Sequence, residues 1–436
     1  MRTSRRGGRL LLAILVVLGL VLAACGDGDD EAADEGDRGT AESTTTSTEP
    51  PPARGDADLV IWADDTRTPA LKPFATEFGT TNGVKVDVVE VAGGSNFSRI
   101  RDLLQLAGPT GEGPDIIIGA NDWIGELTKN GMLEAIDLGA RAADYNKAAI
   151  DAFTLDGKLY GLPYAVENVA LIRNTDLVPT APATWEELEQ TALKLKADGT
   201  VDVALAVQNS PADPFHNYPL FSALGGYVFG KNASGYNPQD LGIDSPGALA
   251  AATKFREWVD SGLINPEITY DIMLEKFATG KAPFAITGPW ALSGDKGFKT
   301  AGVKYSVDPF PTIAGGTAHP FVGVQAFMVS SFAKNKLLAR TFLLDFMGTD
   351  EAQLAMYEAG GRPPALNSAF AKAQDDPDVK GFGLAGAEGY GMPAIPEMAS
   401  VWTAWTDAYT LIFQKKGDPQ QAFKDAAAQI RQKIGG

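Results

Sequence analysis

The stretch "PDIIIGANDWIGEL", residues 114–127, carries the pattern that decides the fold. Three isoleucines in a row are typical of a strand that is buried on both faces, and polar Asn121 and Asp122 follow them directly. The pattern then becomes helical. A buried strand that ends in polar side chains and leads into a helix is the repeating unit of parallel α/β sheets.

The same unit recurs along the chain. The helix-like segment 183–199 is the clearest, because Thr184 and Glu187 form a capping box and Gly199 ends it. Strand-like and helix-like runs alternate up to residue 330, and the chain is mostly helical beyond it; the strand-like runs are 58–63, 84–91, 114–119, 203–207, 283–287 and 321–330. This alternation predicts an α/β fold. About 380 residues exceed what one core usually supports, so we expect two lobes.

The N-terminus predicts export. Four arginines precede an apolar run, residues 10–24, that spans roughly 23 Å as a helix and is shorter than a bilayer core of ~30 Å. Residues 1–24 therefore read as a signal peptide. The run ends in Ala23-Ala24-Cys25, which resembles a lipobox and predicts lipidation of Cys25, the only cysteine. The alternative is an ordinary signal peptide with an incidental cysteine.

Residues 25–56 are acidic and rich in Ser, Thr and Pro, with almost no apolar side chain to bury. This composition predicts a disordered linker between the lipidated cysteine and the folded part. The linker can hold the folded part near a membrane, or simply keep it at a distance from the surface.

Composition excludes several classes of function. The net charge of −18 disfavours binding to nucleic acid or to an anionic lipid surface. With only two histidines, His216 and His319, a His-rich zinc site and most His-based acid–base catalysis are excluded. No serine lies in a G-x-S-x-G elbow. We expect no cofactor and no metal.

The residues that follow the predicted strands suggest a ligand. Ligands of open α/β sheets bind beyond the carboxyl ends of strands, and three of these ends each bring a tryptophan: Trp62, Trp123 and Trp290. Carboxylates accompany two of them. An indole packs on the apolar face of a pyranose, while ionised groups bind its hydroxyls. This favours an uncharged sugar; the alternatives are tryptophans that only pack, and aspartates that only cap helices.

Several motifs together carry a resemblance to a known family. They are "LVIW", "GEGPDIIIGANDWIGEL", "LDGKLYGLPYAVENVALIRNTDL", "PATWEEL", "AITGPW", "PFVGVQAF" and "MPAIPEM". In this order and spacing, over about residues 58–430, the chain resembles the extracellular solute-binding proteins of ABC importers, and among them the maltose/maltodextrin-binding proteins.

The resemblance implies a two-lobed periplasmic-binding-protein fold of type II, an α/β fold with three hinge crossovers. The N-lobe would hold residues 57–165 and 327–371, and the C-lobe residues 166–326 and 372–436. The crossovers would lie near 166–169, 322–326 and 372–378. A sugar would bind between the lobes and stabilise the closed form, which an ABC permease would recognise. No chemistry is implied. The protein would act as a monomer outside the cell, attached to the membrane only through its lipid.

The resemblance also implies the ligand contacts. Aromatic contacts fall on Trp62, Phe215, Tyr270, Trp290 and Trp402, and polar contacts on Asp65, Arg67, Asp122, Glu167, Asp213 and Arg362. Trp402 lies on a helical stripe with Trp405 and Tyr409, a pattern that is also typical of core. Gly119 and Trp123 replace a tryptophan and an arginine common in maltose binders, which implies a shorter ligand or another disaccharide such as trehalose.

Two other functions stay open at this level. An exported glycosidase would need a carboxylate pair at a set separation, such as Asp65 with Glu167 or Asp122 with Asp213. The same scaffold would also suit another small solute, such as a polyol or a peptide.

Overall fold

The computed structural model describes residues 50–92, 97–233 and 235–435. The described residues from Pro51 onward form one compact unit. The predicted signal peptide, Cys25 and most of the predicted linker lie outside the described residues. Among the described helices, none has the length and apolar character needed to cross a membrane.

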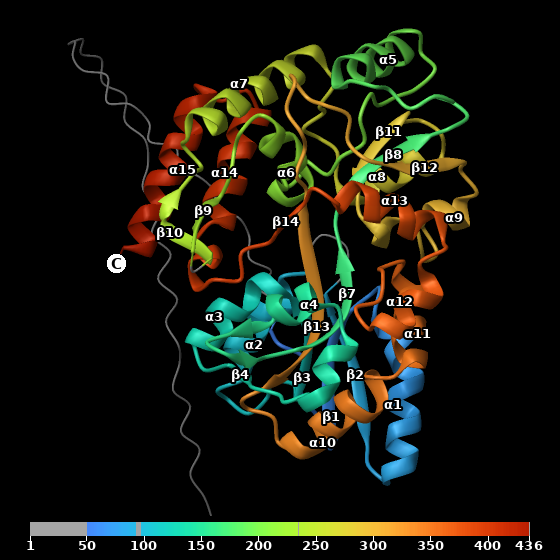
Figure 1. The fold of residues 1–436 in the computed structure, drawn as a ribbon, viewed down its shortest axis with the longest axis vertical. Helices are drawn as coiled ribbons and strands as arrows, with labels where there is room; N and C mark the ends of the chain where they lie inside the picture. Colours follow the sequence, from blue (N-terminus) through green and yellow to red (C-terminus); the bar gives the residue numbers. More distant parts are fainter. Residues whose placement is uncertain (1–49, 93–96, 234, 436) are drawn as a thin grey trace, which may run out of the picture. The chain divides into compact units, whose positions relative to one another are not determined.

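The first lobe surrounds a seven-stranded sheet in the order β14-β13-β3-β1-β2, with β4 and β7 paired to β13 (Figure 1). At its centre β1 (Leu59–Asp64) pairs in parallel with β2 (Val86–Ala92) and with β3 (Ile116–Ala120). All residues of β1 and β3 are buried. The expectation from the isoleucine run is thus confirmed: β3 is a buried strand of an α/β sheet.

Helices cover this sheet. Those of the first lobe are α1 (Thr68–Asn82), α2 (Arg99–Ala107), α3 (Ile124–Lys129), α4 (Lys147–Ala152), α10 (Lys336–Thr341), α11 (Asp350–Gly360) and α12 (Asn367–Ala373). A π-helical turn, η4 (Phe342–Met347), continues α10. The short strands are β4 (Leu133–Glu134), β5 (Thr154–Leu155) and β6 (Lys158–Leu159).

The second lobe surrounds a three-stranded antiparallel sheet in the order β11-β8-β12. Its strands are β8 (Ala170–Asn174), β11 (Phe284–Thr287) and β12 (Tyr305–Asp308). The helices are α5 (Trp185–Ala197), α6 (Pro214–Ala223), α7 (Pro246–Ser261), α8 (Tyr270–Ala278), α9 (Phe298–Ala301), α13 (Pro377–Gly386), α14 (Trp402–Phe413) and α15 (Pro419–Ile434). Half of the predicted capping box is present in α5: Thr184 accepts from the Glu187 N–H, whereas Glu187 accepts from the N–H of Ala183, the residue before the cap.

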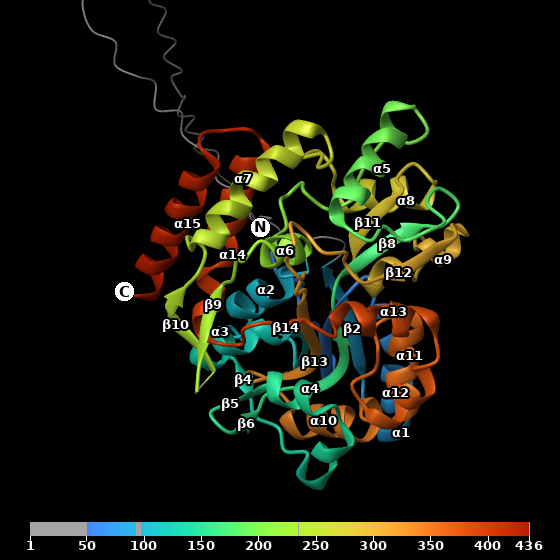
Figure 2. The same ribbon diagram turned by 45° about the horizontal axis from the view of Figure 1, so that its top comes forward.

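An aromatic core holds α7, α14 and α15 together, and both views show the three helices side by side (Figures 1 and 2). Phe255 makes edge contacts with Trp258 and Tyr409, whose ring centroids lie 5.4 and 5.0 Å away. A hairpin of β9 (Phe229–Asn232) and β10 (Gly235–Leu241) lies beside α15. The second lobe therefore packs an all-helical layer beside its sheet.

Two long strands connect the lobes. The strands β7 (Leu162–Glu167) and β13 (Phe321–Ser330) pair antiparallel, with Glu167 opposite Gly323. One end of β13 pairs with β14 (Tyr390–Gly391) and the other joins the first-lobe sheet. A third connection, residues 374–376, joins α12 to α13. These segments lie where we expected crossovers, while the residue boundaries of the lobes stay a prediction.

The predicted linker extends too far toward the folded part. We expected disorder up to residue 56, but Arg54 is buried, donates to the Gly113 carbonyl at 2.8 Å and pairs with buried Asp115. A buried guanidinium is stable only with such partners, so the ordered chain begins before residue 54. The prediction of disorder is wrong for Arg54.

Candidate functional site

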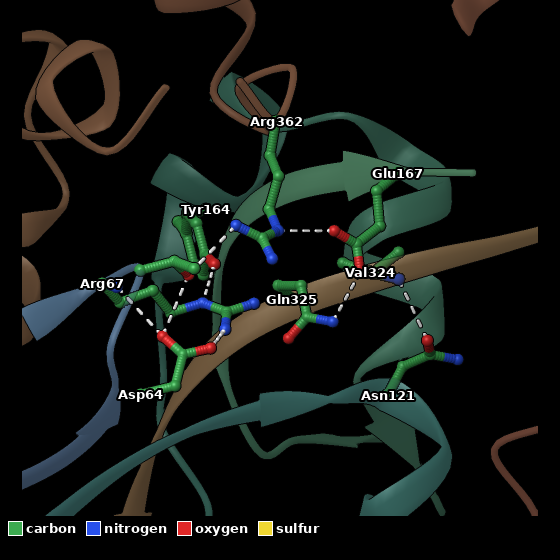
Figure 3. Close-up of polar contacts among 9 residues, drawn as sticks. Asp64, Arg67, Asn121, Tyr164, Glu167, Val324, Gln325 and Arg362 are labelled. Carbon is green, nitrogen blue, oxygen red and sulfur yellow. Dashed lines mark hydrogen bonds and ion pairs between the residues drawn. The ribbon is translucent and has the colours of Figure 1, made fainter. Parts of the chain in front are cut away.

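A buried network of charged side chains lies where β1 and β7 end, and Figure 3 shows its members. Asp64, the last residue of β1, accepts a hydrogen bond from the Arg67 backbone N–H at 2.9 Å and pairs with the Arg67 guanidinium. Arg67 also donates to the Tyr164 hydroxyl. Burial acts to lower the pKa of Arg67, but Asp64, Tyr164 and Glu167 outweigh it and raise the pKa. Arg67 is therefore a fixed positive charge.

Glu167 and Arg362 form the second half of the network. The Arg362 Nε donates to Glu167 Oε2 at 2.6 Å, and Gln325 of β13 donates to Glu167 Oε1 at 2.7 Å. All three side chains are buried. Gln325 Oε1 has no hydrogen-bond partner within the described part of the chain. Glu167 thus ties together β7, β13 and the segment after α11.

Asn121 fixes the neighbouring strand end. Its Oδ1 accepts from the Val324 N–H, and its Nδ2 donates to the Met392 carbonyl, both at 3.0 Å. One side chain at the end of β3 therefore holds β13 and a second-lobe loop in place.

Four aromatic side chains form a row on the second lobe, which we call the aromatic row: Trp290, Phe215, Phe321 and Trp402. Ring centroids lie 6.2 Å apart for Trp290 and Phe215, 6.3 Å for Phe215 and Phe321, and 6.3 Å for Phe321 and Trp402. They come from η3 (Pro289–Ala291), α6, β13 and α14. Phe321 is buried, and the other three are partly exposed.

Two contacts join the aromatic row to the first lobe. The Arg362 guanidinium carbon lies 5.5 Å from the centroid of Trp290. At the other end, the Trp402 Nε1 donates to Asp122 Oδ2 at 2.9 Å. The structure thus brings together seven of the predicted site residues: Arg67, Asp122, Phe215, Glu167, Trp290, Arg362 and Trp402.

The remaining predicted residues lie around this set, except Trp62. Asp213 caps α6 through the Phe215 N–H at 2.8 Å and contacts His216 Nδ1 at 2.6 Å. Burial acts to raise the pKa of Asp213, but these contacts outweigh it and lower the pKa. The pKa of Tyr270 is raised, mainly by burial, and Arg362 and exposed Asp65 are among its charged neighbours.

Trp62 lies in the core. The strand β1 continues two residues beyond it, so Trp62 is not at a strand end, and its indole is only 1% exposed between Val89 and Ile117 of the neighbouring strands. The placement at a strand end is a correction to the sequence interpretation. An indole covered on both faces has none to offer a ligand in this conformation.

Glycines at two strand ends make room for the indole rings of Trp123 and Trp290. A Cβ on Gly119, in β3, would lie 2.3 Å from the Trp123 ring, and a Cβ on Gly288 would lie 2.1 Å from the Trp290 ring. Each indole therefore folds back over its strand end. Trp123 is buried and contacts Phe97, with ring centroids 4.8 Å apart.

Sequence reasoning missed three residues of the site. Asp64 precedes Arg67 by three residues, a spacing that favours an ion pair between them. We named Asp65 as the site residue instead. Gln325 is a lone amide in the apolar run 321–330, which is itself a signal. His216 was considered only as one of two histidines, but it is 5% exposed, and its Nε2 has no hydrogen-bond partner within the described residues.

Asp122 has an unusual protonation equilibrium. The residue is 6% exposed, and burial raises the pKa of its carboxyl group to about 6, against the opposing effects of Arg101 and of the Trp402 N–H. The contact between Asp122 and Trp402 therefore involves a carboxylate at neutral pH and, increasingly, a neutral acid below pH 6. Within residues 50–92, 97–233 and 235–435, His, Cys, Asp and Glu side chains form no cluster suited to a metal ion.

Comparison with known proteins assigns the family. The model of the family described as bacterial extracellular solute-binding protein matches residues 73–381. A galactooligosaccharide-binding protein of Bacillus subtilis (strain 168) is 30% identical over 436 residues, which cover 97% of this chain and 96% of that protein.

Two further relatives show the same likeness. The maltodextrin-binding protein MdxE of Bacillus subtilis (strain 168) is 30% identical over 89% of this chain and 93% of its own length. A maltotriose-binding protein of Pyrococcus abyssi (strain GE5 / Orsay) is 29% identical over 74% of this chain and 70% of its own length.

Proposed function

Since this chain belongs to the bacterial extracellular solute-binding proteins, we propose that it binds a short, uncharged oligosaccharide, of the maltodextrin type or a related sugar such as trehalose, for an ABC importer. One observation carries the proposal. A partly exposed aromatic row on the second lobe meets a buried network of charged groups on the first lobe, through Arg362 on Trp290 and through Trp402 on Asp122.

The chemistry of the two sides is complementary to a sugar. Trp290, Phe215 and Trp402 offer ring faces to the C–H face of pyranoses. Hydroxyl groups need donors and acceptors; the buried His216 Nε2 and Gln325 Oε1 have no hydrogen-bond partner among the described residues, and in this proposal they bind hydroxyls. Asp65 and Tyr270 add polar groups at the exposed edge. An uncharged ligand leaves the existing ion pairs intact.

The names of the relatives support this class of ligand. They are galactooligosaccharide-, maltodextrin- and maltotriose-binding proteins. The sugars in all three names are uncharged oligosaccharides. We therefore propose an oligosaccharide for this chain, and the binding experiment below determines its linkage.

Binding is proposed to work through hinge closure. The two lobes are connected by the paired strands β7 and β13 and by residues 374–376. A sugar held between the aromatic row and the charged network contacts both lobes only when they are closed, so it stabilises the closed form by its differential affinity. The permease of the importer then recognises the closed form.

We further propose that Cys25 carries a lipid at the outer face of the cell membrane and that the protein acts as a monomer. Metabolic labelling with a radioactive fatty acid tests the anchor. The label should appear on the wild-type chain and be absent from Cys25→Ala. Label retained in the variant contradicts the anchor but leaves sugar binding untouched.

Calorimetric titration with maltose, maltotriose, trehalose and a galactooligosaccharide tests the ligand. We expect saturable binding of at least one sugar, and a loss of 10-fold or more in Trp290→Ala, because a buried aromatic contact contributes roughly 1.5–3 kcal/mol. Phe370→Ala is the control, since Phe370 is an exposed ring on α12 outside the site. Failure of every sugar, together with binding of a polyol or peptide, contradicts the proposal.

The same samples test the glycosidase alternative. A binding protein leaves the sugar intact, so chromatography after prolonged incubation should recover only the added oligosaccharide. Release of shorter sugars that is abolished in Glu167→Gln would instead assign catalysis to this site.

A further inference from the structure

A cavity of about 270 Å3 lies beside the β9–β10 hairpin. We call it the hairpin pocket. Its wall is mainly aromatic, with one cation; the residues that matter are Tyr218, Tyr227, Tyr236, Phe321, Tyr390 and Lys231. Figures 1 and 2 show the hairpin on the α15 side of the second lobe. Nothing in the proposed function uses this pocket.

The hairpin pocket shares one residue with the aromatic row. Phe321 lines the pocket and stacks on Tyr218, with ring centroids 3.5 Å apart and planes within 3°. The same Phe321 lies 6.3 Å from both Phe215 and Trp402. The pocket is therefore next to the candidate sugar site but contains none of its other residues.

The rings of the pocket are held in place. The Tyr227 hydroxyl donates to Asp240 at 2.8 Å, and the Tyr236 hydroxyl donates to the Gly391 carbonyl. Lys231 Nζ lies 4.5 Å from the Tyr236 centroid and 5.9 Å from that of Tyr390. Preorganised rings lose little conformational entropy when a ligand binds, and Tyr390, at 38% exposure, leaves the pocket accessible.

The charge of the lining selects a class of ligand. Among the described residues, no carboxylate lines the hairpin pocket, and the ammonium of Lys231 opposes a second cation. An anion would meet a single lysine on a protein of net charge −18. A neutral ring with an apolar face and a polar rim fits tyrosines and one lysine best. The small volume suits a single ring of this kind.

We propose that the hairpin pocket is a second carbohydrate site, which takes one pyranose unit. The choice of a sugar rests on the proposed function, whereas the pocket itself does not. The two sites are separable by substitution, because Trp290 belongs only to the first and Tyr236 and Tyr390 only to the second.

Ligand-observed saturation-transfer NMR on the full chain tests the second site, with maltotriose and trehalose as probes. Trp290→Ala should weaken the tight binding event and leave a weaker one. Adding Tyr236→Ala and Tyr390→Ala should reduce the remaining transfer at least 10-fold. The matched control replaces both residues by Phe, which keeps the rings, and should retain most of the transfer.

Each outcome decides the question. The second site is overturned if Trp290→Ala abolishes all transfer, or if the alanine substitutions leave the residual transfer unchanged. It is also overturned if p-cresol, a neutral aromatic probe, binds there and neither sugar does. If tight binding is absent while transfer sensitive to Tyr390 persists, the proposed function fails and the second site stands. Should the triple variant not fold, Tyr390→Ala with Trp290→Ala replaces it, because Tyr390 is exposed.

Discussion

The two sides that meet at the candidate site are built in opposite ways. On the first lobe, Asp64, Arg67, Glu167 and Arg362 are buried, and each is bound to a partner of opposite charge. On the second lobe, Trp290 and Trp402 are partly exposed and are held mainly by other rings. The first arrangement fixes the ends of the strands, and the second offers surface. The difference separates residues needed for folding from residues needed for binding.

The largest effect should come from a tryptophan that belongs to neither side. Trp62→Ala should lower the free energy of unfolding by about 3–5 kcal/mol, because it leaves a cavity in the central strand. Urea unfolding measures this. The sugar affinity of the folded fraction should change less than 3-fold. A 10-fold loss of sugar affinity without a change in the free energy of unfolding would show that Trp62 belongs to the binding site.

On the first lobe, substitution of Arg362 removes the ion pair with Glu167. Arg362→Met should lower the free energy of unfolding by about 3 kcal/mol, because it leaves the Glu167 carboxylate buried without its ion-pair partner. The control is the double substitution of Glu167→Gln with Arg362→Met, which removes both charges and should recover most of the loss. Equal losses in the single and double variants would show that the ion pair is not the cause.

Substitutions in the aromatic row should weaken sugar binding more than they lower the free energy of unfolding. Trp290→Ala should reduce sugar affinity 10-fold or more, about 1.5–3 kcal/mol. Its effect on the free energy of unfolding should be smaller than that of Trp62→Ala, because Trp290 is partly exposed. Calorimetry and urea unfolding on the same preparations provide both numbers. If Trp62→Ala and Trp290→Ala changed sugar affinity and the free energy of unfolding by similar amounts, the distinction between core and site would be wrong.

The smallest effect concerns the contact of Asp122 with Trp402. The pKa of Asp122 is about 6 in the folded protein, above its ordinary value of 3.8. A raised carboxyl pKa means that stability is fully present below pH 4 and is lost as the pH rises through 6. Wild type should therefore lose about 2 kcal/mol relative to Asp122→Asn between pH 4 and 7.

Urea unfolding of both proteins at pH 4, 5.5 and 7 measures this difference. Asparagine can still accept from the Trp402 N–H, so the variant serves as its own structural control. A constant difference across the three pH values would show that Asp122 titrates normally.

Patterns that are local in sequence were predictable. The buried strand β3 and the N-cap Thr184 of α5 follow from short stretches and are confirmed. The end of β1 was predicted less well: the strand-like run was placed at 58–63, whereas β1 ends at Asp64. Trp62, which we grouped with the residues at strand ends, therefore lies inside the buried strand.

Ion-pair partners were the hardest part to predict. Glu167 is 195 residues from Arg362 in the sequence, whereas the nearer Arg173 pairs with Asp308. Such choices depend on how β7, β8 and β12 are placed in space, which a single sequence does not specify. The resemblance gave the types of residue at the site, and the fold determined their partners.

The central claim is that a sugar closes the two lobes on one another. Spin labels on Glu77 of α1 and on Lys281 before β11, both exposed, measure the distance between the lobes in a Cys25→Ala chain. With the sugar identified by calorimetry, the distance distribution should become shorter and narrower, and Trp290→Ala should shift this response to at least 10-fold higher sugar concentration. A distribution that stays unchanged while calorimetry shows full binding would contradict the claim.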